Sequence, residues 1–350
     1  MKIKNVIRAS LLALVVSGLS VPAMAATNEK PKVKPSFDQY VATIKAEAIA
    51  KGYDEAMVNE ALTGLTYRKK VVKADKNQPE RIQTLDTYLP KRVNDWVVKK
   101  ARNLYKDNKT LLDNIGEKYG VQPRFIIALW GLESAFGKYT GSNNVFASLT
   151  TLAYEGRRES LYRPQIFAAL EIIKRGENTV AGLKGSWAGA MGQTQFMPTS
   201  YLNYAVDYDG DGKKDIWHTQ ADVFASIANY LKTEGWNSSM TWGRQVTLPP
   251  TFNGDESVAK GSRSLKQWLG NYKAAEKSLA DWSQMGVLRT NGTALPLREM
   301  KAALVLPDDK EGRAYLAYNN FKTLMHWNRS YYFVTSVGHL ADRIGFPAIK

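Results

Sequence analysis

Hydrophobic and polar positions recur at helical spacing through most of this chain. Residues 93–105 repeat apolar side chains at three- and four-residue intervals, and residues 111–119 do so again. Residues 219–222, TQAD, have the spacing of a capping box and precede another amphipathic segment that Gly235 closes. A chiefly helical structure is therefore predicted from Phe37 to about Gly235.

The pattern changes after about residue 240. Between residues 242 and 309 the segments TLPPTF, LRTNGTALPL and ALVLPDD predict short strands and turns. Residues 314–345 return to helical spacing. We therefore expect a mainly α (α+β) fold with one region over 37–240 and a β-containing and helical C-terminal segment over 241–350.

The first 25 residues are predicted to be a cleaved signal peptide. They combine a basic start, a short apolar core and an Ala23-Met24-Ala25 cleavage site. The alternative, a membrane anchor, would need roughly 18 or more apolar residues. Residues 26–36 are polar and contain proline, which indicates a flexible arm. The sequence has no Cys, so a lipid-modified Cys and disulfides are excluded, and we expect a soluble exported protein, periplasmic in a Gram-negative host.

The formal net charge of +15 indicates anionic surroundings. Lys and Arg are scattered along the chain, and no nucleic-acid-binding signature is present. Because the leader directs the protein out of the cell, an anionic cell wall or membrane surface fits this charge better than nucleic acid. Three His and no Cys also exclude a Cys nucleophile and disfavour a zinc cluster.

Glu133 is the one carboxylate in an otherwise apolar run, FIIALWGLESAFG, at residues 125–137. Burial disfavours the charged form of a carboxyl group and raises its pKa, which suits a general acid near neutral pH. On a helix, Trp130 and Phe136 would form an apolar wall beside Glu133, and Gly137 would leave room for a ligand. The alternative is a surface glutamate, but no polar face surrounds it. Glu133 is therefore the candidate catalytic residue.

A second candidate site is the glycine-rich block GSWAGAMGQTQFMPTSY at residues 185–201. Its glycines permit close backbone approach, while Ser186, Gln193 and Gln195 offer neutral hydrogen-bonding groups beside aromatic rings. Sugars need such groups for their hydroxyls and flat apolar surfaces for their C–H faces. The block is either a sugar-binding segment or a glycine-rich turn packed on the core.

The acidic segment at residues 207–215 begins with the D-x-D-x-D-G spacing of a calcium loop. The twelfth position, usually a bidentate Glu, is His218, so one oxygen ligand is missing. Weak binding of a structural calcium ion and a solvated turn without metal are both compatible with this pattern. The candidate ligands are Asp207, Asp209, Asp211 and Asp215.

Several blocks in the same order resemble the lytic murein transglycosylase B family. They are GLESAFGKYTG, TLAYEGRR, the glycine-rich block, AVDYDGDGKKDIW and ANYLKTEGW. The resemblance extends from QPERIQTLDTYL at 78–89 to AYNNFKTLMHWNRS at 317–330. It implies a lysozyme-like catalytic core with additional helices and a small β part around the cleft. It also implies cleavage of the β-1,4 bond between N-acetylmuramic acid and N-acetylglucosamine in peptidoglycan.

The resemblance also assigns roles to individual residues. Glu133 falls on the family's single catalytic acid/base. The residues that match positions of its sugar cleft are Ser186, Gln195, Arg157, Arg158, Tyr318 and Asn319. No cofactor is required for the reaction that the resemblance implies, and the acidic loop is a candidate site for a structural calcium ion. Peptidoglycan glycan strands are the expected partner, with cell-wall synthesis or division proteins as further candidates and no integral membrane anchor.

Most glycosidases use two carboxylates, whereas these motifs offer one acid in an apolar setting. One glutamate suffices if the C6 hydroxyl of the muramic residue attacks its own C1. Glu133 would then act first as acid and next as base, leaving a 1,6-anhydromuramic end. The alternatives are a lysozyme-type hydrolase that uses water, and a non-catalytic wall-binding protein.

Overall fold

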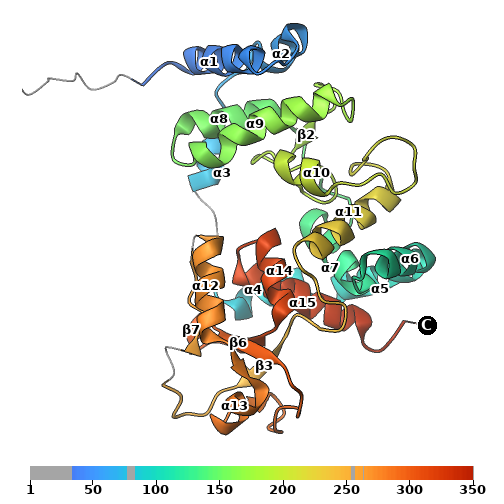
Figure 1. The fold of residues 1–350 in the computed structure, drawn as a ribbon, viewed down its shortest axis with the longest axis vertical. Coiled ribbons are helices and arrows are strands. Elements are labelled where there is room, and N and C mark those ends of the chain that lie inside the picture. The colour runs from blue at the N-terminus through green and yellow to red at the C-terminus, as the bar shows by residue number, and fades with distance from the viewer. Residues whose placement is uncertain (1–33, 77–82, 254–256, 263, 350) are drawn as a thin grey trace, which may run out of the picture. The chain divides into compact units, whose positions relative to one another are not determined.

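The fold is built mainly from α-helices, with two small antiparallel sheets. The computed structural model describes residues 34–76, 83–253, 257–262 and 264–349 (Figure 1). The helices are α1 (Phe37–Ala50), α2 (Glu55–Leu62), α3 (Lys69–Lys76), α4 (Leu85–Arg92), α5 (Asp95–Asp107), α6 (Lys109–Tyr119), α7 (Pro123–Ser134), α8 (Val145–Glu155), α9 (Glu159–Lys174), α10 (Pro198–Tyr204), α11 (Gln220–Thr233), α12 (Leu265–Ala275), α13 (Leu279–Gln284), α14 (Asn319–Trp327) and α15 (Tyr331–Gly345). The strands are β1 (Asn143–Asn144), β2 (Lys184–Gly185), β3 (Gly243–Thr247), β4 (Lys277–Ser278), β5 (Leu288–Arg289), β6 (Lys301–Val305), β7 (Pro307–Lys310) and β8 (Ala314–Ala317). The predicted mainly helical fold with small β parts is confirmed.

The start of α7 follows directly from its sequence. Gly120 ends α6 in the left-handed conformation with φ of 68°, which glycine adopts without steric cost. Pro123 then occupies the first turn of α7, where its missing N–H has no partner to lose. The residues of α7 from Phe125 to Leu132 are all buried, so this helix runs through the core.

Helix α11 forms as expected, but the capping box predicted before it is wrong. Thr219 occupies the N-cap position and makes no side-chain cap bond. The carboxylate of Asp222 is buried and instead accepts hydrogen bonds from the backbone N–H groups of Tyr208 and Asp215, at 2.7 and 2.8 Å. Asp222 therefore holds the preceding acidic loop against α11.

The larger sheet has five strands in the order β4-β6-β8-β3-β5. Strand β8 pairs antiparallel with both β3 and β6, with Ala317 opposite Gly243 on one side and Ala303 on the other. The strands predicted after residue 242 are therefore confirmed in part, but α12 and α13 also lie in this stretch. The expected helix from residue 314 is wrong at its start, where β8 forms the centre of the sheet.

Three apolar clusters organise the core. The first surrounds α7 and includes buried residues of α5, α11, α14 and α15. The second joins α1 and α2 to α8, α9 and the glycine-rich block, and the third lies on the five-stranded sheet. Because the first cluster takes residues from both sides of position 240, the two predicted regions share a core there; the boundary itself remains a prediction.

The contacts divide the chain after Ser36, and Phe37–Lys350 forms one compact unit. The predicted signal peptide at 1–25 and most of the predicted arm at 26–36 lie outside the described residues. Among the helices that are described, none combines the length and apolar character needed to cross a bilayer.

Candidate active site

Glu133 lies in the last turn of α7, at the end of the buried apolar run. Helix α7 packs against α15, α5 and α11, which cover its sides. Leu132 and Ser134, its two neighbours, are buried, whereas Glu133 itself is partly exposed. The fold thus places one carboxyl group where an apolar core reaches the surface.

One direct hydrogen bond fixes the Glu133 carboxyl group. The indole Nε1 of Trp327, the last residue of α14, donates to Glu133 Oε1 at 2.6 Å. Burial raises the pKa of Glu133 to about 7, while the Trp327 hydrogen bond and the positive charge of Arg92 act in the opposite direction. Loss of hydration outweighs both favourable interactions, because neither supplies the charge compensation of a close ion pair.

The backbone reverses sharply directly after Glu133. Ala135, Phe136 and Gly137 have successive positive φ angles of 51°, 62° and 80°. The turn is held by Ser134, whose hydroxyl donates to the carbonyl of Trp130 at 3.1 Å and accepts from the N–H of Gly137 at 3.0 Å. Two non-glycine residues in the left-handed region store strain, a feature that clusters at functional sites.

Gly137 does not leave room for a ligand, contrary to the expectation from sequence. A Cβ at this position would overlap the side-chain amide of Gln193. That amide accepts a hydrogen bond from Trp130 Nε1 at 2.8 Å and donates to the carbonyl of Trp217 at 2.8 Å. The glycine is needed because Gln193 packs against the turn and links it to the glycine-rich block.

The glycine-rich block lies beside the same turn. Strand β2 pairs with β1, and Gln195 Nε2 donates to the carbonyl of Thr140 at 3.2 Å and to that of Gly192 at 2.9 Å. Ser186 Oγ accepts hydrogen bonds from the N–H groups of Ala188 and Ala190. Both predicted sugar-binding residues are partly exposed, and their role in binding remains a prediction.

The paired arginines contact an acid rather than the Glu133 turn. Arg157 and Arg158 both form ion pairs with Asp75 of α3, which is buried. These contacts attach α3 to the segment between α8 and α9. Substrate binding by both arginines stays a prediction, and it requires them to contact the substrate while they are paired with Asp75.

Tyr318 and Asn319 lie at the start of α14, at the opposite end of that helix from Trp327. Tyr318 is buried in the third apolar cluster, and Asn319 Nδ2 donates to the carbonyl of Gly235 at 3.1 Å. Asn320 is buried and bonds the backbone of Asn237 in both directions. The contacts of this motif therefore fix α14 against the loop after α11, and substrate binding by Tyr318 and Asn319 stays a prediction.

Trp327 is the site residue that the sequence reasoning missed. Its ring contacts those of Phe196 and Tyr230, with centroid distances of 5.3 and 4.7 Å. The adjacent His326 Nδ1 lies 2.5 Å from Glu234 Oε2, which fixes the end of α14. The only sequence signal was that Trp327 lies near the end of the last matching block, AYNNFKTLMHWNRS at 317–330.

The acidic loop brings three of its four candidate ligands together. One carboxylate oxygen from each of Asp207, Asp209 and Asp211 lies within 4.8 Å of the others. Asp215 is directed elsewhere, because its Oδ1 accepts from the N–H groups of Trp217 and His218. Three converging carboxylates fit a calcium ion. The twelfth position of the loop, however, is His218, whose Nδ1 lies 3.3 Å from Asp215 Oδ2.

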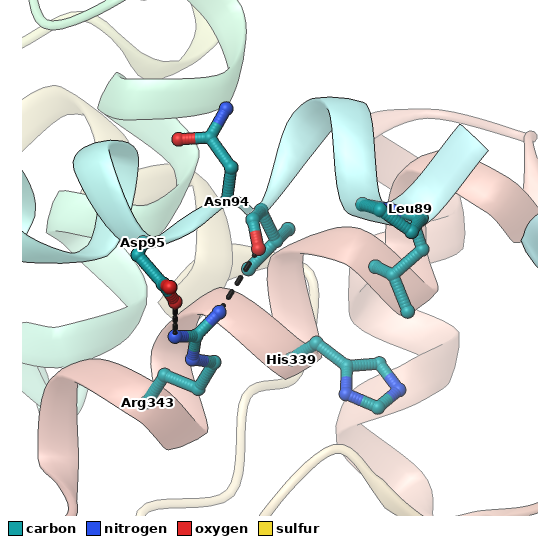
Figure 2. A pocket seen from close by; sticks show the side chains of 7 residues that line it. Leu89, Asn94, Asp95, His339 and Arg343 are labelled. Atoms are coloured by element: carbon teal, nitrogen blue, oxygen red, sulfur yellow. Dashed lines mark hydrogen bonds and ion pairs between the residues drawn. The ribbon is translucent and has the colours of Figure 1, made fainter. Parts of the chain in front are cut away.

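A separate cavity of about 380 Å³ lies between the α4–α5 junction and α15, and Glu133 is not among its lining residues (Figure 2). Arg343 spans this junction, with Nη2 2.5 Å from Asp95 Oδ1 and Nη1 donating to the carbonyl of Val93 at 3.0 Å. Burial, together with the nearby positive charges of Arg313 and Arg343, lowers the pKa of His339 to about 4. The residues that line this cavity therefore hold the start of α5 against α15, and we do not assign them an acid/base role.

Comparisons with known proteins place this geometry in a family. The model of the transglycosylase SLT domain matches residues 36–342. Membrane-bound lytic murein transglycosylase B of Escherichia coli K12 is 34% identical over 182 residues, 49% of this chain and 49% of that protein. The chain thus matches about half the length of this curated relative.

Two solved structures extend the comparison. SltB3 from Pseudomonas aeruginosa, in complex with NAG-anhNAM-pentapeptide, is 37% identical with a TM-score of 0.80, covering 89% of this chain and 80% of that chain. Slt35 from Escherichia coli, in complex with calcium, is 24% identical with a TM-score of 0.73, covering 89% and 94%, and shows a shared fold alone. Because the family model spans the chain from α1 to α15, the chain belongs to the transglycosylase SLT domain family, and the resemblance to lytic murein transglycosylase B is confirmed.

Proposed function

We propose that this protein is a lytic transglycosylase that cleaves the β-1,4 bond between N-acetylmuramic acid and N-acetylglucosamine in peptidoglycan. The observation that carries the proposal is the carboxyl group of Glu133, a partly exposed residue in the last turn of an apolar helix, which has a pKa of about 7. Such a group is protonated in a large fraction of molecules at neutral pH. It can therefore give a proton to a leaving oxygen and then accept one.

A single carboxyl group is sufficient if the substrate supplies the nucleophile. In the described part of the chain, the side chains that act on the pKa of Glu133 are Trp327 and Arg92, and neither is a carboxylate. Protonated Glu133 gives its proton to the glycosidic oxygen as the bond from that oxygen to C1 breaks. The resulting carboxylate takes the proton of the C6 hydroxyl as O6 bonds to C1. The product is a 1,6-anhydromuramic end, no water is consumed, and Glu133 is protonated again.

The intramolecular attack has an entropic advantage, because the nucleophile is tethered to the carbon it attacks. An anhydromuramic product is also consistent with the NAG-anhNAM-pentapeptide bound to SltB3. Ser186 and Gln195, beside the turn that follows Glu133, would hydrogen-bond the sugars. If the predicted leader is cleaved after Ala25, the reaction takes place in the periplasm, with cell-wall synthesis or division proteins as candidate partners.

A calcium ion would have a structural role in this scheme. Asp207, Asp209 and Asp211 would hold it, and its two positive charges would offset most of the charge of these three carboxylates. Asp222 connects that loop to α11 through the N–H groups of Tyr208 and Asp215. The proton transfers of the reaction involve Glu133 alone.

The sugar ends released from purified peptidoglycan test the proposed reaction. We expect ends that are lighter by one water than hydrolytic ends, and no label incorporated when digestion is run in isotopically labelled water. Mass spectrometry of the released muropeptides makes both measurements. Labelled reducing ends would instead identify a lysozyme-type hydrolase, and binding without any release would identify a wall-binding protein.

Replacing Trp327 with phenylalanine should move the pH profile of cleavage upward. The indole hydrogen bond favours the charged carboxylate, so its loss raises the pKa of Glu133 above about 7. Because the first step needs the protonated acid, the fall of kcat/KM at high pH should begin at a higher pH than in the parent.

The matched control is Trp282→Phe, which also removes an indole donor, here the bond from Nε1 to the carbonyl of Ala302 in the third cluster. This variant should keep the parent's pH profile. Equal shifts in both variants, or none in Trp327→Phe, would show that the Trp327 bond does not govern the acid.

A further inference from the structure

The outer face of α5 exposes a large aromatic side chain close to the Glu133 turn. Trp96 is 67% exposed, although tryptophan usually buries most of its surface. It lies in the first turn of α5, after the N-cap residue Asn94. Folding the chain does not require this exposure, and tryptophan is enriched at binding interfaces, where its apolar ring and polar N–H can both be used.

Lys100 connects Trp96 to the turn that follows Glu133. Its Nζ lies 5.4 Å from the centroid of the Trp96 ring and 5.0 Å from that of Phe136. Phe136 folds back onto α7, where a Cβ at Gly131 would overlap its ring. The Trp96–Lys100 surface, meaning these two side chains, therefore meets the turn that follows Glu133 at the ring of Phe136.

Arg92 makes a second connection between this part of the chain and the end of α7. Its Nη2 donates to the carbonyl of Leu132 at 2.6 Å, directly before Glu133. The α4–α5 junction that carries both Arg92 and Trp96 is held by Arg343 through Asp95 and Val93 (Figure 2). Trp96 and Lys100 are consequently presented on a supported helix, as a binding surface requires.

Positive side chains outnumber acidic ones on either side of Trp96 along the chain. Within the described residues, the cations of this region have no carboxylate at ion-pair distance; they are Lys91, Arg92, Lys99 and Lys100. The one acid at the start of α5, Asp95, is already paired with Arg343. An anionic group that approached Trp96 would therefore meet unpaired positive charge.

We propose that the Trp96–Lys100 surface binds a muramoyl-peptide unit of the glycan strand next to the cleaved bond. The indole face stacks on the C–H face of a pyranose ring, and the ammonium group of Lys100 pairs with a carboxylate of the stem peptide. This inference rests on the proposed function, since it assigns a peptide-bearing substrate to the same site. A peptide-bearing sugar fits because it combines an apolar ring face with a nearby negative charge, as the surface requires.

Two variants separate the two halves of the proposal. Trp96→Ala should raise KM about tenfold on soluble glycan oligomers both with stem peptides and after an amidase has removed them. Lys100→Glu should raise KM about fivefold or more on the peptide-bearing oligomers alone, and Lys100→Arg should restore it. In both cases kcat should change little, because neither residue contacts the reacting atoms.

The controls are Leu297→Ala, at another exposed apolar side chain, and Lys266→Glu, at an exposed lysine of α12. Both should keep the parent's KM. If Trp96→Ala or Lys100→Glu has the KM of the parent, the proposal is wrong. If Lys100→Glu raises KM equally on oligomers with and without stem peptides, Lys100 does not contact the peptide. Loss of binding to phosphatidylglycerol vesicles, with glycan kinetics unchanged, would identify a lipid surface instead.

The same surface can be tested if the parent protein does not cleave glycan. Calorimetric titration of Glu133→Gln with a soluble muropeptide should then give a Kd that rises about tenfold when Trp96→Ala is added. If Trp96→Ala weakens muropeptide binding but the parent protein does not cleave glycan, the proposed function is wrong and the binding surface is supported. An unchanged Kd with normal parental cleavage would contradict the surface alone.

Discussion

Glutamine in place of Glu133 is expected to lower the rate of glycan cleavage by roughly 10²- to 10⁴-fold, the range that general acid–base catalysis supplies. The amide keeps the shape of the side chain and can still accept the hydrogen bond from Trp327, but it has no proton to transfer at neutral pH. Release of soluble muropeptides from purified peptidoglycan measures the loss. Binding of soluble muropeptides should remain, so a variant that cleaves at the parent's rate would show that Glu133 is not the acid.

The same substitution should increase stability at high pH, which gives an independent check on the acid. The pKa of Glu133 is about 7 in the folded protein against an ordinary value of 4.5, so the folded state holds this proton more tightly than the unfolded chain does. The stabilising contribution is complete below about pH 4.5 and is lost as pH rises through 7.

Because glutamine has no such proton, Glu133→Gln should be more stable than the parent by about 2 kcal/mol at pH 8, and similar to it near pH 4. The gain is smaller than the full pKa shift would give because Glu133 is partly exposed, so solvent screens part of the cost of its charge. Urea unfolding at both pH values gives the two free energies of unfolding. Glu117→Gln, at an exposed position of α6, is the control and should show no gain at pH 8.

The position of Glu133 could be predicted from sequence because the relevant signals are local. Gly120 and Pro123 mark the boundary between α6 and α7, and the apolar run fixes that helix in the core. A carboxylate at the end of such a helix must lose part of its hydration wherever the remaining elements pack. The direction of the pKa shift could therefore be predicted from the apolar run, and the family resemblance then indicated the reaction that is proposed.

The groups that hold the carboxyl group in place could not be predicted in the same way. Trp327 is 194 positions along the chain from Glu133, and only the packing of α14 brings the two together. Gly137 was expected to create space, yet the side chain that uses this space, Gln193, arrives from another segment. Periodicity describes which face of an element is buried, but it carries no information on which distant side chain covers that face.

Strand β8 illustrates the same limit for the fold. Strand β8 is a run of four buried residues without polar alternation, and periodicity alone does not separate such a run from a buried helix segment. Its neighbours β3 and β6 decide the outcome by pairing with it on both sides. The C-terminal β part was therefore predicted in the right region. The error fell on β8, whose conformation depends on the strands that pair with it.

Alanine at Gly141 is expected to destabilise the protein by about 3 kcal/mol, the largest effect that we expect from a single methyl group near the site. Gly141 has φ of 88°, and a Cβ there would overlap the peptide group between Gly185 and Ser186. Left-handed backbone costs a residue with a side chain about 1–2 kcal/mol. Forced overlap with backbone costs about 1–3 kcal/mol more, because β1 and β2 would have to move apart.

Gly64→Ala separates these two contributions. Gly64 has φ of 71°, but a Cβ added there would meet no atom within 4 Å, so only the backbone term applies. The expected loss of stability for Gly64→Ala is about 1 kcal/mol. Urea unfolding gives the free energy of unfolding of both variants. Equal losses of stability would show that β1 and β2 adjust freely to the extra methyl group at position 141. If they do not adjust, Gly141→Ala should also slow glycan cleavage, because the β1–β2 pair holds Ser186 and the glycine-rich block beside the turn that follows Glu133.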